Sequence, residues 1–158
     1  MYQQSLLKEF LDLKKVPYEH HIHRTAYTAQ EIADEEHISG MIVAKTVVVK
    51  ADNRFVMAVL PAPVKVDLAA LKAAVGAREL RLATELEFKG LFPDAEAGAM
   101  PPFGNLYGIP VYVEVSLTRD PEIEFNAGTH QDTIRMKYED FARLVHPKTY
   151  AFALRQAA

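Results

Sequence analysis

Residues 40–63 read GMIVAKTVVVKADNRFVMAVLPAP, and this stretch decides the fold. It contains two apolar runs, Ile42–Lys50 and Arg54–Leu60, separated by Ala51-Asp52-Asn53. The Asp-Asn pair suits a tight turn, and Pro61 ends the second run because proline has no amide to donate to a sheet. The stretch therefore predicts two strands joined as a hairpin.

Lys45 stands inside the first run, in step with Val43, Val47 and Val49. Side chains alternate along a strand, so these four share one face. If helices cover one side of the sheet, the valine face is the better candidate for burial, and Lys45 then points inward. Its ammonium could reach water or pair with a carboxylate at the sheet end. It could instead stand at a pocket floor and bind a substrate carbonyl or carboxylate, with its pKa lowered by partial burial. The strand pattern leaves both interpretations open.

Helix and strand patterns interleave along the rest of the chain. Capping signals support three of the helices: Thr28 with Glu31, Asp67 with Gly76, and Thr84 with Glu87. The predicted helices cover Leu6–Leu13, Ala29–His37, Leu68–Val75, a short segment after Thr84, and Asp140–Val145. The predicted extended segments are Tyr18–His23, Leu80–Leu82, Val111–Val115, Ile123–Asn126 and Thr133–Tyr138. The C-terminal KTYAFALRQAA fits a strand or a helix equally well.

Length and connection lengths together predict the fold class. The 158 residues suit one domain, residues 1–158, with a substantial core. Three strand connections are too short to be helical crossovers. We therefore expect an α/β fold of the α+β type, with a mixed, mostly antiparallel sheet or a partly closed barrel surrounded by helices.

Composition narrows the classes of function. The absence of cysteine excludes thiolate catalysis and cysteine-metal sites. A net charge of −3 argues against a protein that coats nucleic acid, although a local contact with a nucleic-acid end stays open. No apolar run is long enough to cross a membrane, and the N-terminus lacks the pattern of a signal peptide. We expect a cytoplasmic protein.

The segment Phe92–Gly108 is rich in proline and glycine and shows no period. An irregular segment this long is more often a functional loop than filler. Within it, Gly98–Gly104 reads GAMPPFG. Such a loop could aim backbone N–H groups at a carbonyl or a developing oxyanion, and a tight structural turn explains the same composition.

Three segments carry a resemblance to a known family. They are AKTVVVKADNRFVMAVLPAPVKVDLAALKAAVGARELRLATEL, GAMPPFG and EFNAGTHQDTIRMKYEDFARLV. In this order they resemble the YbaK / prolyl-tRNA-editing family of aminoacyl-tRNA deacylases, from about Thr28 to Val145. The resemblance implies a YbaK-like fold and hydrolysis, in trans, of the ester that joins a wrongly attached amino acid to the 3′ end of a tRNA.

The resemblance also implies which residues act. Lys45 matches the essential lysine of the family and is our catalytic candidate, near the aminoacyl carbonyl or the terminal ribose. The loop that matches Gly98–Pro102 contacts the aminoacyl group through its backbone. Our candidates for substrate binding are Thr46, Gly98, Ala99, Met100, Pro101, Pro102, Phe103, Gly104, Asn126, Gly128 and His130.

The resemblance extends to cofactors and partners. Members use no metal, no other cofactor and no serine or cysteine nucleophile, so water attacks. The expected partners are the 3′ acceptor end of a misacylated tRNA and, in addition, an aminoacyl-tRNA synthetase, with no membrane and a monomer or homodimer as the assembly. The alternative function is a non-catalytic module that binds aminoacyl-tRNA or a synthetase through the same pocket.

Two departures from the family pattern leave substrate identity and two side-chain roles open. Many relatives have a second glycine directly after the one that matches Gly98, whereas this chain has Ala99, followed by Met100, which changes the shape of the acyl pocket. The turn reads FNAGTH, without the basic residue usual after Ala-Gly. Asn126 and His130 could line the site, and Asn126 could equally cap the turn.

Two further signals have simpler explanations. His20, His21 and His23 suggest a metal site, because His21 and His23 would share a strand face. The sequence offers no clear third ligand for that pair, and histidines on a solvated edge strand are the simpler explanation. The second signal is a group of basic residues that could contact tRNA phosphates, although a solvated charged face is the simpler account. The residues of this group are Arg78, Arg81 and Lys89, with Lys50 or Arg135.

Overall fold

The predicted hairpin forms the centre of the structure. A computed structural model describes residues 5–22, 31 and 39–154. Strands β2 (Ala44–Ala51) and β3 (Arg54–Pro61) pair antiparallel, in register along their whole length. The turn narrows to Asp52-Asn53, where Asp52 takes a positive φ of 56°. The Asp52 carboxylate accepts hydrogen bonds from the amides of residues 78 and 79, which fixes the hairpin tip to the chain beyond helix α3 (Leu68–Val75).

A five-stranded mixed sheet is built on this hairpin, in the order β4-β2-β3-β5-β8. Strand β4 (Leu80–Leu82) pairs antiparallel with β2. Strand β5 (Val111–Glu114) runs parallel to β3, and β8 (Lys148–Tyr150) runs parallel to β5. Within the C-terminal segment that the sequence left undecided, Lys148–Tyr150 is therefore a short strand at the sheet edge.

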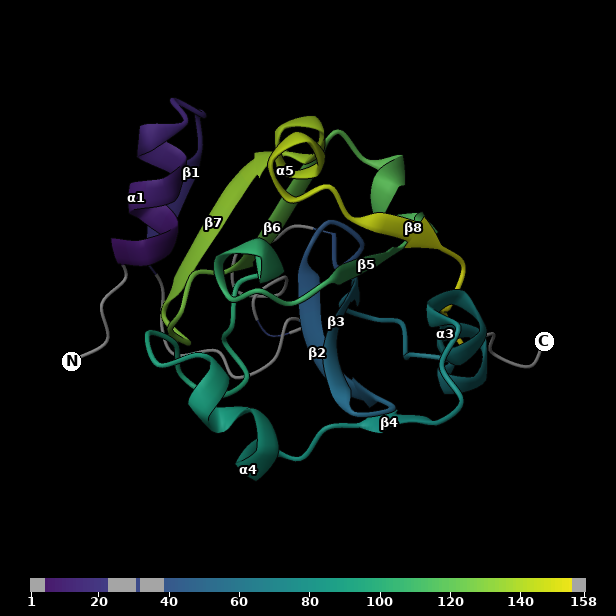
Figure 1. The fold of residues 1–158 in the computed structure, drawn as a ribbon. Coiled ribbons are helices and arrows are strands. Elements are labelled where there is room, and N and C mark those ends of the chain that lie inside the picture. The colour runs from purple at the N-terminus through teal and green to yellow at the C-terminus, as the bar shows by residue number, and fades with distance from the viewer. Residues whose placement is uncertain (1–4, 23–30, 32–38, 155–158) are drawn as a thin grey trace.

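The other three strands form an antiparallel sheet in the order β1-β7-β6. Their bounds are β1 (Glu19–Ile22), β7 (Asp132–Lys137) and β6 (Glu122–Asn126). In Figure 1, β1 and helix α1 (Ser5–Leu13) lie beside β7 on one side of the molecule, and α3 (Leu68–Val75) lies on the other. Helix α5 (Tyr138–Val145) follows β7 directly.

An isolated parallel bridge between Val43 and Glu124 links the two sheets. It is supported by the Glu124 amide, which donates to the carbonyl oxygen of Ile42 at 2.9 Å. The structure confirms the predicted α+β fold with mixed sheets. Across the described residues these sheets do not close into a barrel.

Local capping signals predict the helices well. The Asp67 carboxylate accepts from the amide of Ala70, and Gly76 ends α3 in the left-handed conformation with a φ of 75°. Thr84 and Glu87 form the predicted capping box of the short helix α4 (Glu85–Phe88). Three 3-10 turns follow: η1 (Lys89–Leu91), η2 (Gly104–Leu106) and η3 (Val115–Arg119). Apart from residue 31, the predicted helix Ala29–His37 lies outside the described residues.

Two apolar clusters fill the two faces of the β2–β3 hairpin. The larger contains Ala44 and Val48 together with side chains from both sheets, α1, α5 and the irregular segment. The smaller contains Val49 and Leu60 and is covered by α3. We predicted that the valine face of β2 is buried, and Val43 and Val49 are fully buried. The opposite face is buried as well, because the hairpin is a central element rather than a one-sided one. No helix among the described residues is long and apolar enough to cross a membrane.

Candidate functional site

Lys45 lies in β2 opposite Leu60 of β3, so its stem points to the side of the smaller cluster. The side chain is half-buried. Within the described part of the chain, its ammonium has no hydrogen-bond or ion-pair partner. Burial lowers the pKa of Lys45 below its ordinary value, and the nearby charge of Lys65 lowers it further. The site therefore holds a partly desolvated cation with spare hydrogen-bond donors.

A bridge between the sheets lies two residues before Lys45. Val43 pairs with Glu124 in an isolated parallel bridge, and Lys45 and Asn126 follow two positions later in their own segments. Ile123 and Phe125 belong to the larger cluster, so Asn126, which alternates with them, points away from that cluster, as Lys45 does. The bridge therefore joins the segment that carries the predicted lysine to the strand that leads into the predicted turn.

The turn after β6 holds the predicted loop through its backbone. The amide of Gly128 donates to the carbonyl oxygen of Ala99 at 3.0 Å. In return, the amide of Glu96 donates to the carbonyl oxygen of Gly128 at 2.7 Å. Gly128 has a φ of 101°, and a Cβ there would lie 3.4 Å from the carbonyl oxygen of Asp94. A glycine at this position therefore allows the turn and the loop to approach closely.

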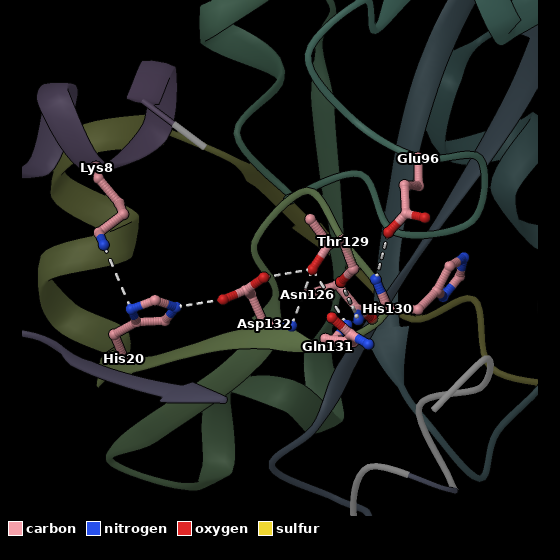
Figure 2. Close-up of polar contacts among 8 residues, drawn as sticks. All are labelled: Lys8, His20, Glu96, Asn126, Thr129, His130, Gln131 and Asp132. Carbon is pink, nitrogen blue, oxygen red and sulfur yellow. Dashed lines mark hydrogen bonds and ion pairs between the residues drawn. The ribbon is translucent and has the colours of Figure 1, made fainter. Parts of the chain in front are cut away.

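His130 joins the same contact through main chain and side chain. Its amide donates to Oε1 of Glu96 at 2.8 Å, as Figure 2 shows, and its Nε2 lies 2.9 Å from the carbonyl oxygen of Ala97. Gly98 is exposed with a φ of 83°, and a Cβ on it would lie 3.5 Å from the His130 ring. The predicted pair of Gly98 and His130 is thus brought together.

The Gly98 amide is the loop donor best suited to a substrate. It faces the thioether of Met100, with N and Sδ 3.2 Å apart. Thioether sulfur is a weak acceptor, so a carbonyl oxygen could take its place. The next amide, of Ala99, already donates to the carbonyl oxygen of Glu96. An N–H with a weak, replaceable partner on an exposed residue is a candidate donor to an oxyanion.

The remaining residues of the loop are anchors. Phe103 is fully buried and its ring packs against those of Phe10, Phe125 and Phe141. A Cβ on Gly104 would lie 2.2 Å from a backbone carbonyl oxygen, so no side chain fits there. The other loop residues between Gly98 and Phe103, which are Ala99, Met100, Pro101 and Pro102, are buried too. Any contact of these residues with substrate stays a prediction.

Two predicted binding residues outside the loop remain, Asn126 and Thr46. Asn126 donates from Nδ2 to the carbonyl oxygen of Thr129 at 3.2 Å, which supports the capping role. Thr46 lies opposite Val59 and points to the larger cluster, away from Lys45. The structure therefore gives no support for placing Thr46 with the lysine.

A pocket of 380 Å³ opens beside the loop. Its wall includes Ala97 and Met100 of the loop and Phe88 and Lys89 at the end of α4. Glu85 lines the pocket as well, so its wall is mixed, with one acidic and one basic side chain beside the apolar ones.

Three of the basic residues that could contact tRNA phosphates form ion pairs within the protein. Arg81 and Lys50 both pair with Glu87, and Arg135 pairs with the fully buried Glu124.

The sequence analysis missed one buried network. His20 of β1 binds Asp132 of β7, with Nε2 and Oδ1 2.6 Å apart, and Asp132 in turn binds Thr129. The histidines had suggested metal ligands or a solvated edge strand. The residues of the pair are 112 positions apart, so no local pattern could connect them.

Comparison with known proteins identifies the family. The family model "Aminoacyl-tRNA editing domain" matches residues 23–144. The chain belongs to the aminoacyl-tRNA editing domain family. Editing domains of this kind act on aminoacyl-tRNA, so family membership supports an editing function and an aminoacyl-tRNA substrate.

Solved structures share the fold of this editing domain. A proposed trans-editing enzyme for prolyl-tRNA synthetase matches with a TM-score of 0.83 at 19% identity, over 96% of this chain and 97% of the other. A scaffold protein from a study of epitope backbone grafting by design matches with a TM-score of 0.84 at 18% identity, over 96% and 97%. The hypothetical protein APE2540 matches with 0.83 at 17% identity, over 94% and 99%. A search of curated proteins finds no match.

Proposed function

We propose that this editing domain is a trans-editing hydrolase that deacylates misacylated tRNA, with Lys45 as its central polar group. One observation carries the proposal: a half-buried ammonium without a partner in the described residues lies two residues beyond the bridge to β6, the strand that leads into the turn holding the Gly98 loop. The proposed trans-editing role of a structural neighbour is in line with it. We further propose that the enzyme acts without a metal.

The proposed reaction is ester hydrolysis. Water adds to the aminoacyl carbonyl and forms a tetrahedral oxyanion. The C–O bond to the terminal ribose then breaks, the ribose oxygen takes a proton, and the free amino acid leaves. An activated ester needs little beyond a positioned water and support for the oxyanion. Lys45 would bind the carbonyl or the ribose, and the Gly98 amide would donate to the oxyanion in place of its contact with Met100.

A small acyl group suits this site. The contacts between the 126–130 turn and the loop leave little room, and Ala99 and Met100 are buried rather than open to solvent. One methylene changes binding by only about 1 to 3 kcal/mol, so synthetases misload small amino acids and a second site must remove them. We therefore expect alanine, serine or cysteine on the wrong tRNA among the best substrates.

The experiment is a deacylation assay with purified protein and a panel of misacylated tRNAs. For the best substrate, we expect Lys45→Ala to lower kcat by about 100- to 1,000-fold, the usual loss when one oxyanion-stabilising group is removed. Lys72→Ala is the matched control, because Lys72 is exposed on α3. If no substrate is deacylated faster by the wild type than by Lys45→Ala, catalysis is refuted. Tight binding of the same tRNAs would then support the non-catalytic module.

A further inference from the structure

Three side chains outside the Gly98 loop hold the turn between β6 and β7 by hydrogen bonds. They belong to His20, Asp132 and Thr129. Figure 2 shows Asp132 between His20 on one side and Thr129 on the other. Asp132 is a buried residue, only 5% exposed, and its two carboxylate oxygens have different partners. Oδ1 lies 2.6 Å from Nε2 of His20, and Oδ2 lies 2.5 Å from the hydroxyl of Thr129.

Lys8 of α1 decides which nitrogen of His20 carries the proton. The Lys8 ammonium lies 3.3 Å from Nδ1 of His20. An ammonium can only donate, so Nδ1 accepts and the ring proton is on Nε2. His20 therefore donates to Asp132, which leaves the second carboxylate oxygen to accept from Thr129. The helix α1 and strand β1 thus set the orientation of a carboxylate in β7.

Thr129 connects the Asp132 carboxylate to the backbone around His130. Its hydroxyl oxygen accepts from the amides of Gln131 and Asp132, at 3.1 and 3.0 Å, so the residue before His130 is bonded to the two residues that follow it. The His130 amide and ring then meet Glu96 and the carbonyl oxygen of Ala97, next to Gly98. A change in this turn would therefore move the Gly98 loop.

We infer that His20, Asp132 and Thr129 are positioning residues for the editing reaction, which hold the His130 turn so that the Gly98 amide is aimed at the substrate carbonyl. This inference rests on the proposed function. None of the three needs to touch substrate. Their effect should fall on the chemical step, because a displacement of about 1 Å at a reacting group can cost about 100-fold in rate.

The test uses the full chain and a pair of variants at one position. Thr129→Val keeps the shape and removes the hydroxyl, and Thr129→Ser keeps the hydroxyl. We expect Thr129→Val and Asp132→Asn to lower kcat about tenfold or more with KM within about twofold, and Thr129→Ser to keep its activity. Asp140→Asn is the control, because Asp140 pairs with Arg143 on α5. Equal losses in Thr129→Val and Thr129→Ser, or no loss in Thr129→Val, would overturn the inference.

A second readout does not depend on activity. In the free protein, NMR resonances of the Gly98 amide and the His130 ring should shift in Thr129→Val and Asp132→Asn but not in Thr129→Ser or Asp140→Asn. Unmoved resonances in Thr129→Val refute the positioning role even if the variant is inactive. If the resonances move while wild-type protein and Lys45→Ala deacylate equally slowly, the proposed function fails and the positioning of the loop stands. Circular dichroism of each variant separates these outcomes from unfolding.

Discussion

Phe103 links the stability of the core to the shape of the loop, and Phe103→Ala tests this link. The side chain is fully buried and contacts three rings, at centroid distances of 6.2, 5.4 and 5.4 Å. Removing a buried phenylalanine costs about 3 to 5 kcal/mol, and each aromatic pair adds about 0.5 to 1.5 kcal/mol beyond burial. We expect the upper half of the first range. For a chain of this length, that loss lowers Tm by about 8 to 20 °C.

The assay is urea unfolding followed by far-UV circular dichroism, since the chain has no tryptophan. Leu86→Ala is the control: Leu86 is 87% exposed on α4, and its loss should change the free energy of unfolding by less than about 0.5 kcal/mol. Phe103→Leu, which keeps most of the volume, should lose less than Phe103→Ala. A cost below about 1 kcal/mol for Phe103→Ala would refute our account of the ring as the anchor of the loop.

Four further predictions concern the loop and the lysine. Gly104→Ala should destabilise the fold by about 1 to 3 kcal/mol, because the added methyl would meet a backbone oxygen at 2.2 Å, whereas Gly90→Ala, with nothing within 4 Å, should be neutral or stabilising in the same urea assay. In an NMR titration of the lysine side chains, the midpoint of Lys45 should lie below 10.5 and rise in Lys65→Gln but not in Lys72→Gln; an unmoved midpoint in Lys65→Gln contradicts the assigned cause. Because the charged form of Lys45 is disfavoured in the folded state, Lys45 should make stability rise with pH between its lowered pKa and 10.5. Lys45→Arg should deacylate poorly, since a planar guanidinium does not replace a compact ammonium, and unchanged turnover would mean that the lysine is placed wrongly.

Local chemistry made much of the fold predictable. The hairpin, the Asp67 cap and the Thr84–Glu87 capping box depend on residues within a few positions of each other, and all three are confirmed. The C-terminal strand was undecidable because β8 has only three residues, all exposed, and owes its shape to its neighbour β5. The division into two sheets was also hidden, because it depends on pairing between distant segments.

Part of the candidate site was also predictable from the sequence, and part was not. Strand alternation predicted that Lys45 faces inward, and the composition of Gly98–Gly104 suggested either a loop that aims N–H groups at a substrate or a tight structural turn. Neither pattern contains the parallel bridge from Val43 to Glu124 that joins the lysine's segment to the strand before the turn. The pair of His20 and Asp132 was equally hidden, since each residue alone is typical of a solvated strand.

The pairing of the C-terminal segment has a consequence for how the protein folds during synthesis. Phe152 is fully buried in the smaller cluster, its amide donates to the buried carboxylate of Glu114, and its carbonyl oxygen accepts from the amide of Asp67. The α3 side of the sheet thus stays incomplete until the ribosome has released the chain beyond Phe152. Nascent protein would expose apolar surface up to that moment, and a ribosome that stalls shortly before it would leave a chain prone to aggregation.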